Sequence, residues 1–166
     1  FSCKYANIAM NYCLNKGFSK EELLNRLITL KPVKYRLNKV FENKQFIFIN
    51  DSKSTTSNSS KYCFETFPDR PRILILGGKH KSNKFNIKIN NNDLVLIYGI
   101  DKNIINKEIN GLLFNNLEEI MKYIKTLKNK YYVLFSPGCD SHDQYKSFID
   151  RGNHFNELIN IYFKYE

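Results

Sequence analysis

The sequence predicts an α/β fold: a mostly parallel sheet with helices on both faces, preceded by a helical hairpin. Two observations predict the sheet. Short apolar runs bounded by proline or glycine recur, as in "RILILGG" (72–78) and "YYVLFSPG" (131–138), and such runs are typical of strands buried on both faces. Segments with helical spacing separate these runs, and strands that alternate with helices favour a parallel sheet.

The composition is that of a folded chain without a membrane segment. Hydrophobic residues make up 42% of the 166 residues, which is enough for one domain, or one domain with an appendage. No apolar run approaches the roughly 20 residues that span a bilayer, so we expect a cytoplasmic protein, or a piece of one. We also expect it to be a monomer. The four cysteines form no CxxC pair, so we expect them to be reduced and buried, with no zinc site.

The formal net charge of +10 has two interpretations. A basic chain can bind nucleic acid. Alternatively, abundant lysine and asparagine with no tryptophan is typical of a protein from an AT-rich genome. The lysines are scattered and not gathered in one stripe, which favours the compositional interpretation.

The first 32 residues predict a helical hairpin. One helix is expected over 4–16 and ends at Gly17. The second is expected to begin with a capping box of Ser19 and Glu22 and to end at Pro32. Its inward residues are expected to be Leu23, Leu24, Leu27 and Ile28. The pair is too small to form a core alone, so it either docks on the rest of the chain or is the tail of another domain.

From residue 33 onward the pattern alternates. We expect strands over 37–43 and 45–50, joined by a turn at Asn43-Lys44, then strands over 72–78, 93–99, 113–115 and 131–138. We expect helices over 55–66, 102–110, 117–127 and 153–162. In such sheets ligands collect outside the carboxyl ends of the strands.

Polar clusters follow three of these strands. The first, residues 50–55, offers Lys53 and hydroxyl groups at a helix start, which could bind an anion or could only cap the helix through Ser54 or Thr55. The second, residues 77–82, places two glycines and lysines after a strand, which suits an anion site or a simple turn. The third, residues 136–143, contains Ser141, His142 and Cys139.

The third cluster does not predict a nucleophile. Ser141 and His142 are adjacent and no GxSxG elbow is present, which argues against a catalytic triad. Cys139 has no evident activating partner, so packing is the favoured interpretation. Three loops whose residues suit anion binding, at the same edge of the predicted sheet, together indicate a site for an acidic small molecule.

The segments "INDSKSTTSNS", "LILGGKHKSNKF" and "LFSPGCDSHDQYKSFIDRGNHFNELI" resemble the C-terminal domain of the D-glutamate-adding Mur ligases of peptidoglycan synthesis. The resemblance covers about residues 33–166, and residues 1–32 are similar to the last helices of the central, ATP-binding domain. It implies a Rossmann-like domain and a chain that is a fragment, inactive alone. The phosphate loop, the magnesium ligands and the UDP-sugar domain are expected elsewhere.

The resemblance also implies a reaction and its residues. ATP, with Mg²⁺, would phosphorylate UDP-N-acetylmuramoyl-L-alanine, and D-glutamate would attack the acyl phosphate. Nucleotide contacts fall on Arg36 and Asp51, and no catalytic residue or metal ligand is implied within the chain. Substrate contacts fall on six residues: Lys53, Thr55, Lys81, Ser141, His142 and Phe148.

The chain departs from the family pattern at a few positions. Tyr35 stands where histidine is usual, His142 where an apolar residue is usual, and Gly138 and Asp140 interrupt the serine-proline loop. Asp140 adds negative charge near an acidic substrate. The alternatives are another amino-acid-adding Mur ligase or a basic nucleic-acid-binding module.

Overall fold

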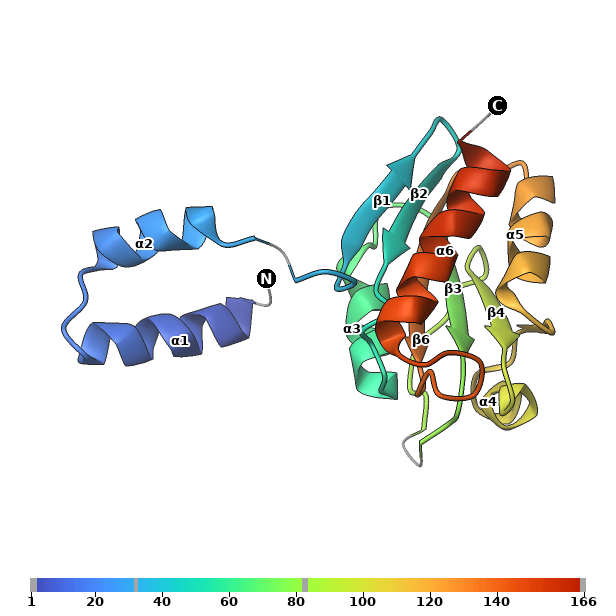
Figure 1. Cartoon of the computed structure of the whole chain (residues 1–166), viewed down its shortest axis with the longest axis horizontal. Coiled ribbons are helices and arrows are strands. Elements are labelled where there is room, and N and C mark those ends of the chain that lie inside the picture. Colours follow the sequence, from blue (N-terminus) through green and yellow to red (C-terminus); the bar gives the residue numbers. More distant parts are fainter. Residues whose placement is uncertain (1–2, 32, 82–83, 165–166) are drawn as a thin grey trace. The chain divides into compact units, whose positions relative to one another are not determined.

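The computed structural model describes residues 3–31, 33–81 and 84–164, and the side chains from residue 7 onward within them. The chain divides into two compact units, residues 1–33 and residues 34–166, which are described separately (Figure 1).

The first unit is a helical hairpin of α1 (Cys3–Asn15) and α2 (Lys20–Thr29). Ser19 caps α2 by accepting the backbone N–H of Glu22 at 3.2 Å, which confirms the Ser19 half of the predicted capping box. The prediction of four inward residues was wrong in part. Leu23 is buried, but Leu24 and Ile28 are 45% and 83% exposed, because two short helices share only a narrow apolar stripe. Pro32, the predicted stop, lies outside the described residues.

The second unit contains a six-stranded sheet in the order β1-β2-β6-β3-β4-β5. The strands are β1 (Asn38–Glu42), β2 (Phe46–Asn50), β3 (Arg72–Gly77), β4 (Leu94–Tyr98), β5 (Leu112–Leu113) and β6 (Tyr131–Gly138). Among the strand pairs of the described residues, β1–β2 is antiparallel and the other four are parallel. The predicted mostly parallel sheet is therefore confirmed.

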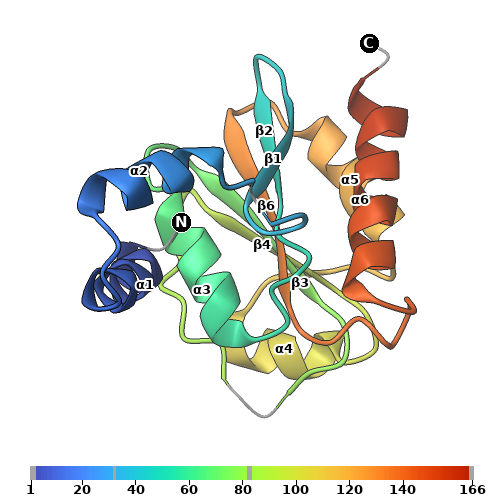
Figure 2. The same cartoon turned by 60° about the vertical axis from the view of Figure 1, so that its left-hand side comes forward.

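Helices cover both faces of this sheet (Figure 2). They are α3 (Ser57–Thr66), α4 (Lys102–Ile109), α5 (Leu117–Thr126) and α6 (Phe148–Phe163). In β6, Val133 and Phe135 join the core under α5 and α6, whereas Leu134 joins the core under α3 and α4. Strand side chains alternate between faces, so each central strand contributes to two cores, which explains its unbroken apolar run.

One helix is longer than predicted. Helix α6 begins at Phe148 and not at residue 153, and Ser147 caps it by accepting the N–H of Asp150 at 3.2 Å. Glycine is a poor helix former, yet Gly152 lies inside α6. A Cβ atom there would lie 2.4 Å from the Tyr35 ring, so the glycine makes room for that ring.

A buried ion pair joins the starts of β3 and β4. Arg72 Nη2 lies 2.8 Å from Asp93 Oδ2, and the two side chains are 9% and 3% exposed. Burial acts to raise the pKa of Asp93, but the hydrogen bonds and charge of Arg72 outweigh it and lower that pKa. The charged carboxylate therefore stabilises the fold above its unfolded pKa of about 3.9, and this stabilisation is lost as pH falls through the folded pKa.

We expect Asp93→Asn to lower the free energy of unfolding by about 2 kcal/mol at pH 7, because one charged partner of a buried pair is lost. The difference from the wild type should shrink below about pH 4. Urea unfolding of both proteins, followed by circular dichroism at pH 7 and at a pH below about 4, measures the difference in free energy of unfolding. Glu42→Gln, at the exposed pair of Lys39 and Glu42, is the control and should change little. Equal stability of Asp93→Asn and wild type at pH 7 would contradict the expectation.

Candidate functional site

The three polar loops lie side by side at the carboxyl ends of β2, β6 and β3. Strand β6 lies between β2 and β3, and all three run parallel. Asn50 pairs with Phe135, and Gly77 pairs with Gly138. The carboxyl ends of these strands are therefore neighbours, as the sequence predicted.

Asp51 organises the first loop from inside. It is 1% exposed, and its carboxylate accepts hydrogen bonds from the Ser54 hydroxyl, the Ser136 hydroxyl at 2.7 Å and the Leu37 N–H at 3.1 Å. Burial raises the pKa of Asp51, although these hydrogen bonds oppose the shift. This arrangement favours a positioning role, and its predicted contact with nucleotide stays a prediction.

The helix after this loop is capped by a different residue than predicted. Thr56, not Ser54 or Thr55, is the N-cap of α3, and it forms a reciprocal capping box with Ser59. Ser54 is committed to Asp51. Thr55, between Ser54 and Thr56 in the chain, is half-buried. The cap and the loop thus use separate hydroxyl groups, which leaves the Thr55 side chain outside the cap.

The structure brings several predicted site residues together beside this loop. Lys53 Nζ lies 5.7 Å from the centroid of the Phe148 ring, and the Ser52 hydroxyl donates to the Phe148 carbonyl at 2.8 Å. The Lys53 N–H donates to the Tyr35 carbonyl at 3.0 Å. Arg36, next to Tyr35, is exposed. Lys53 of this loop therefore lies beside Phe148 of α6 and is hydrogen-bonded to the segment that carries Arg36, so three different parts of the chain meet here.

The second and third loops are joined by their backbones. Lys79 and Asp140 exchange N–H···O hydrogen bonds of 2.9 and 3.0 Å. Gly78 has a φ of 126°, and a Cβ atom there would lie 2.1 Å from the Asp140 carbonyl oxygen. Only glycine permits this close approach. Ser82, which the sequence placed in the second loop, lies outside the described residues.

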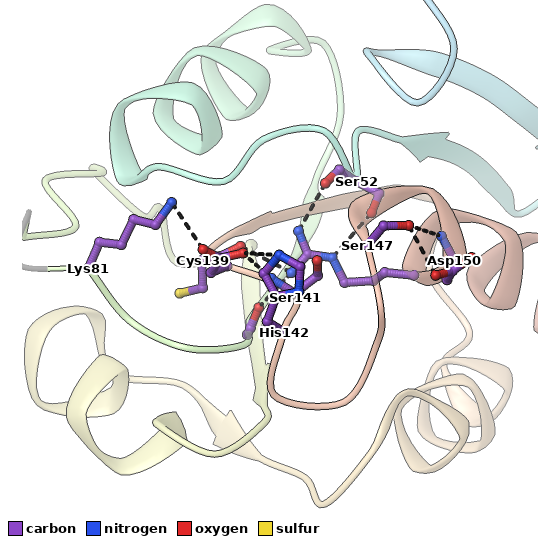
Figure 3. Close-up of polar contacts among 10 residues, drawn as sticks. Ser52, Lys81, Cys139, Ser141, His142, Ser147 and Asp150 are labelled. Carbon is purple, nitrogen blue, oxygen red and sulfur yellow. Dashed lines mark hydrogen bonds and ion pairs between the residues drawn. The ribbon is translucent and has the colours of Figure 1, made fainter.

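The side chains of these loops also meet. Lys81 Nζ lies 3.4 Å from Asp140 Oδ2, and Figure 3 shows Lys81 extending toward the segment of Cys139, Ser141 and His142. His142 Nε2 lies 3.7 Å from Asp140 Oδ1, and its side chain is 65% exposed. Ser141 is buried. The two basic side chains thus face the same carboxylate.

Cys139 is a packing residue, as predicted. It is fully buried, and burial raises the pKa of its thiol to about 12, although the charge of Arg151 opposes the shift. A thiol with this pKa is not ionised at neutral pH. Cys63 is likewise buried with a raised pKa, whereas Cys13 is only half-buried, so the expectation of burial fails there.

Sequence reasoning missed Arg151, the residue that joins all three loops. It is fully buried. Its guanidinium donates to the Ser52 carbonyl at 2.9 Å, the Cys139 carbonyl at 3.0 Å and the Gly77 carbonyl at 3.5 Å. Among the described residues no acidic group pairs with it. Helical spacing in the sequence could have revealed its burial, because Phe148, Arg151 and Phe155 fall on one face of α6.

The described residues contain neither a candidate membrane span nor a candidate metal cluster. No helix in ranges 3–31, 33–81 and 84–164 has the length and apolar character of a membrane span. Within the same ranges, no group of three or more His, Cys, Asp or Glu side chains is placed to hold a metal ion.

Curated relatives with one shared name match this chain. The UDP-N-acetylmuramoylalanine--D-glutamate ligase of Buchnera aphidicola subsp. Baizongia pistaciae is 38% identical over an alignment 137 positions long, which covers 75% of this chain and 30% of that protein. The ligase of the same name from Aquifex aeolicus is 32% identical over an alignment 167 positions long, which covers 95% of this chain and 40% of that protein. This chain belongs to the Mur ligase family. The resemblance seen in the sequence is therefore confirmed, and the nucleic-acid alternative is not favoured.

A solved structure supports the fold of this Mur ligase chain. The UDP-N-acetylmuramoylalanyl-D-glutamyl-2,6-diaminopimelate--D-alanyl-D-alanyl ligase from Acinetobacter baumannii matches 93% of this chain and 35% of its own, with a TM-score of 0.59 and 13% identity. No protein-family model matches the chain. The chain spans about a third of the length of the curated relatives it matches.

Proposed function

We propose that this chain is part of an ATP-dependent ligase that joins D-glutamate to UDP-N-acetylmuramoyl-L-alanine. Residues 33–166 would be its C-terminal domain, and residues 1–32 the last helices of its central domain. The observation that carries the proposal is the convergence of three polar loops at the carboxyl ends of β2, β6 and β3, in a chain whose curated relatives carry this ligase name.

The chemistry of the loops suits an amino acid with two carboxylates. Lys81 and Lys53 supply positive charge, and charge-assisted hydrogen bonds to carboxylates are among the stronger ones in proteins. In this proposal Thr55, Ser141, His142 and Phe148 complete the D-glutamate side. These side chains bind and orient the substrate so that its amine reaches the activated carboxyl group.

The proposed contact with the nucleotide is assigned chiefly to Arg36. Its side chain is exposed, the next residue, Leu37, donates its N–H to Asp51, and a guanidinium suits a phosphate. When bound, ATP with Mg²⁺ supplies the phosphoryl group that activates the alanyl carboxyl group. The described residues offer no cluster for Mg²⁺, so its ligands are proposed to lie in the rest of the ligase. The cytoplasmic location stays a prediction.

Phosphate release by the ligase that contains this chain tests the proposal. With ATP and UDP-N-acetylmuramoyl-L-alanine, we expect release to require D-glutamate. L-Glutamate, L-lysine and diaminopimelate are the matched comparisons, and none of them should support it. Release that depends on one of these amino acids would instead identify another Mur ligase specificity. The 166-residue chain alone should release no phosphate.

A further inference from the structure

Three nitrogen-bearing groups lie around the carboxylate of Asp140. Lys81 Nζ lies 3.4 Å from Oδ2, and His142 Nε2 lies 3.7 Å from Oδ1. The backbone N–H of Ser141 donates to Oδ1 at 2.9 Å. Figure 3 shows Lys81, Ser141 and His142 at this point. Two basic side chains and an N–H group around one carboxylate are the components of a carboxylate-binding site.

These donors belong to residues that the proposed function gives to the substrate. Lys81, Ser141 and His142 are three of its six substrate contacts, and each has a nitrogen atom within 3.7 Å of the Asp140 carboxylate. A D-glutamate carboxylate presents the same chemical group as the Asp140 side chain. Both cannot occupy the same set of donors at once.

We propose that Asp140 is an internal competitor that occupies a carboxylate position of the substrate site and thereby sets the affinity for the acidic substrate. This inference rests on the proposed function for the identity of that substrate. The carboxylate must turn away from Lys81 before a substrate carboxylate takes its place.

The surrounding backbone holds Asp140 at this position. Its N–H and carbonyl both pair with Lys79, so the residue cannot leave without breaking the contact between the second and third loops. Its side chain is 31% exposed, however, and that of Lys81 is 48% exposed. The backbone is fixed while the carboxylate can rotate into solvent, which is what a displaceable competitor requires.

The carboxylate is charged at neutral pH. Partial burial acts to raise the pKa of Asp140, but the hydrogen bond and charge of Lys81 outweigh it, so that pKa is lowered. Because exposed ion pairs are weak, we expect its competition to weaken substrate binding only about two- to fivefold.

Titrations of the 166-residue chain with D-glutamate and with succinate, followed by NMR at the amide of Ser141, test the proposal. Asp140→Asn should bind both probes about two- to fivefold more tightly than the wild type. Asp150→Asn removes the same charge from an exposed residue of α6 and should match the wild type. Adding Lys81→Met to Asp140→Asn should remove the gain, since the two residues act as a pair.

The outcomes separate this inference from the proposed function. Tighter binding of succinate without tighter binding of D-glutamate supports the internal competitor and counts against D-glutamate as the substrate. Unchanged or weaker binding of both probes by Asp140→Asn overturns the inference. An equal gain in Asp150→Asn also overturns it, because the effect would then be one of net charge.

Discussion

Replacing Lys81 with alanine is expected to raise the KM of the complete ligase for D-glutamate by roughly 10- to 100-fold, because a hydrogen bond to a charged group is lost. The KM values for ATP and UDP-N-acetylmuramoyl-L-alanine should change little, since the lysine lies on the D-glutamate side of the proposed site. Steady-state phosphate release with each substrate varied in turn measures all three values.

The matched control for this prediction is Lys84→Ala. Lys84 is an exposed lysine three residues further along the chain, so its removal changes the net charge equally. We expect its KM for D-glutamate to stay within about twofold of the wild type. If Lys81→Ala kept a normal KM for D-glutamate, the assignment of Lys81 to the substrate would be wrong.

The effect of Lys81 should also depend on Asp140. In the wild type part of the lysine's charge is directed at Asp140 Oδ2. We therefore expect Lys81→Ala to raise the KM by a larger factor in an Asp140→Asn background than in the wild type. A double-mutant cycle over these two residues measures the difference. Equal factors in both backgrounds would show that the two side chains act independently on the substrate.

The second large effect is expected for Arg151→Met, which should lower the free energy of unfolding by about 3–5 kcal/mol. The guanidinium is fully buried and donates to three backbone carbonyl groups, one in each of the three polar loops. Methionine fills part of the volume but donates no hydrogen bond, so buried carbonyl groups lose their partner. Urea unfolding followed by circular dichroism measures the loss.

Two further variants sharpen this test. Arg151→Lys keeps the charge but cannot reproduce the planar fork, so we expect a smaller loss than for methionine and a protein that still folds. Arg70→Met removes a half-buried arginine that lies over the Tyr132 ring, and it should cost less than about 1 kcal/mol. A wild-type unfolding free energy for Arg151→Met would contradict the structural role given to this residue.

The secondary structure was predictable because its causes are local. The bounds of β6 agree with the predicted range of 131–138. Strand β3 ends one residue earlier than predicted, and β4 is one residue shorter than predicted at each end. The start of α6 was missed because Gly152 argues locally for a break, whereas the space beside the Tyr35 ring requires glycine there. The cap of α3 was misplaced because several hydroxyl groups precede it, and only the buried Asp51 decides which of them is taken.

The sequence by itself determined the alternating α/β pattern, the three polar loops and the resemblance to the Mur ligases, since each depends on residues that are close in the chain. Only the tertiary structure decided which of those polar groups meet. Strand order places β6 between β2 and β3, which buries Arg151 among three loops and directs Lys81 at Asp140. Such pairings join segments far apart in sequence, and burial, not local propensity, sets their strength.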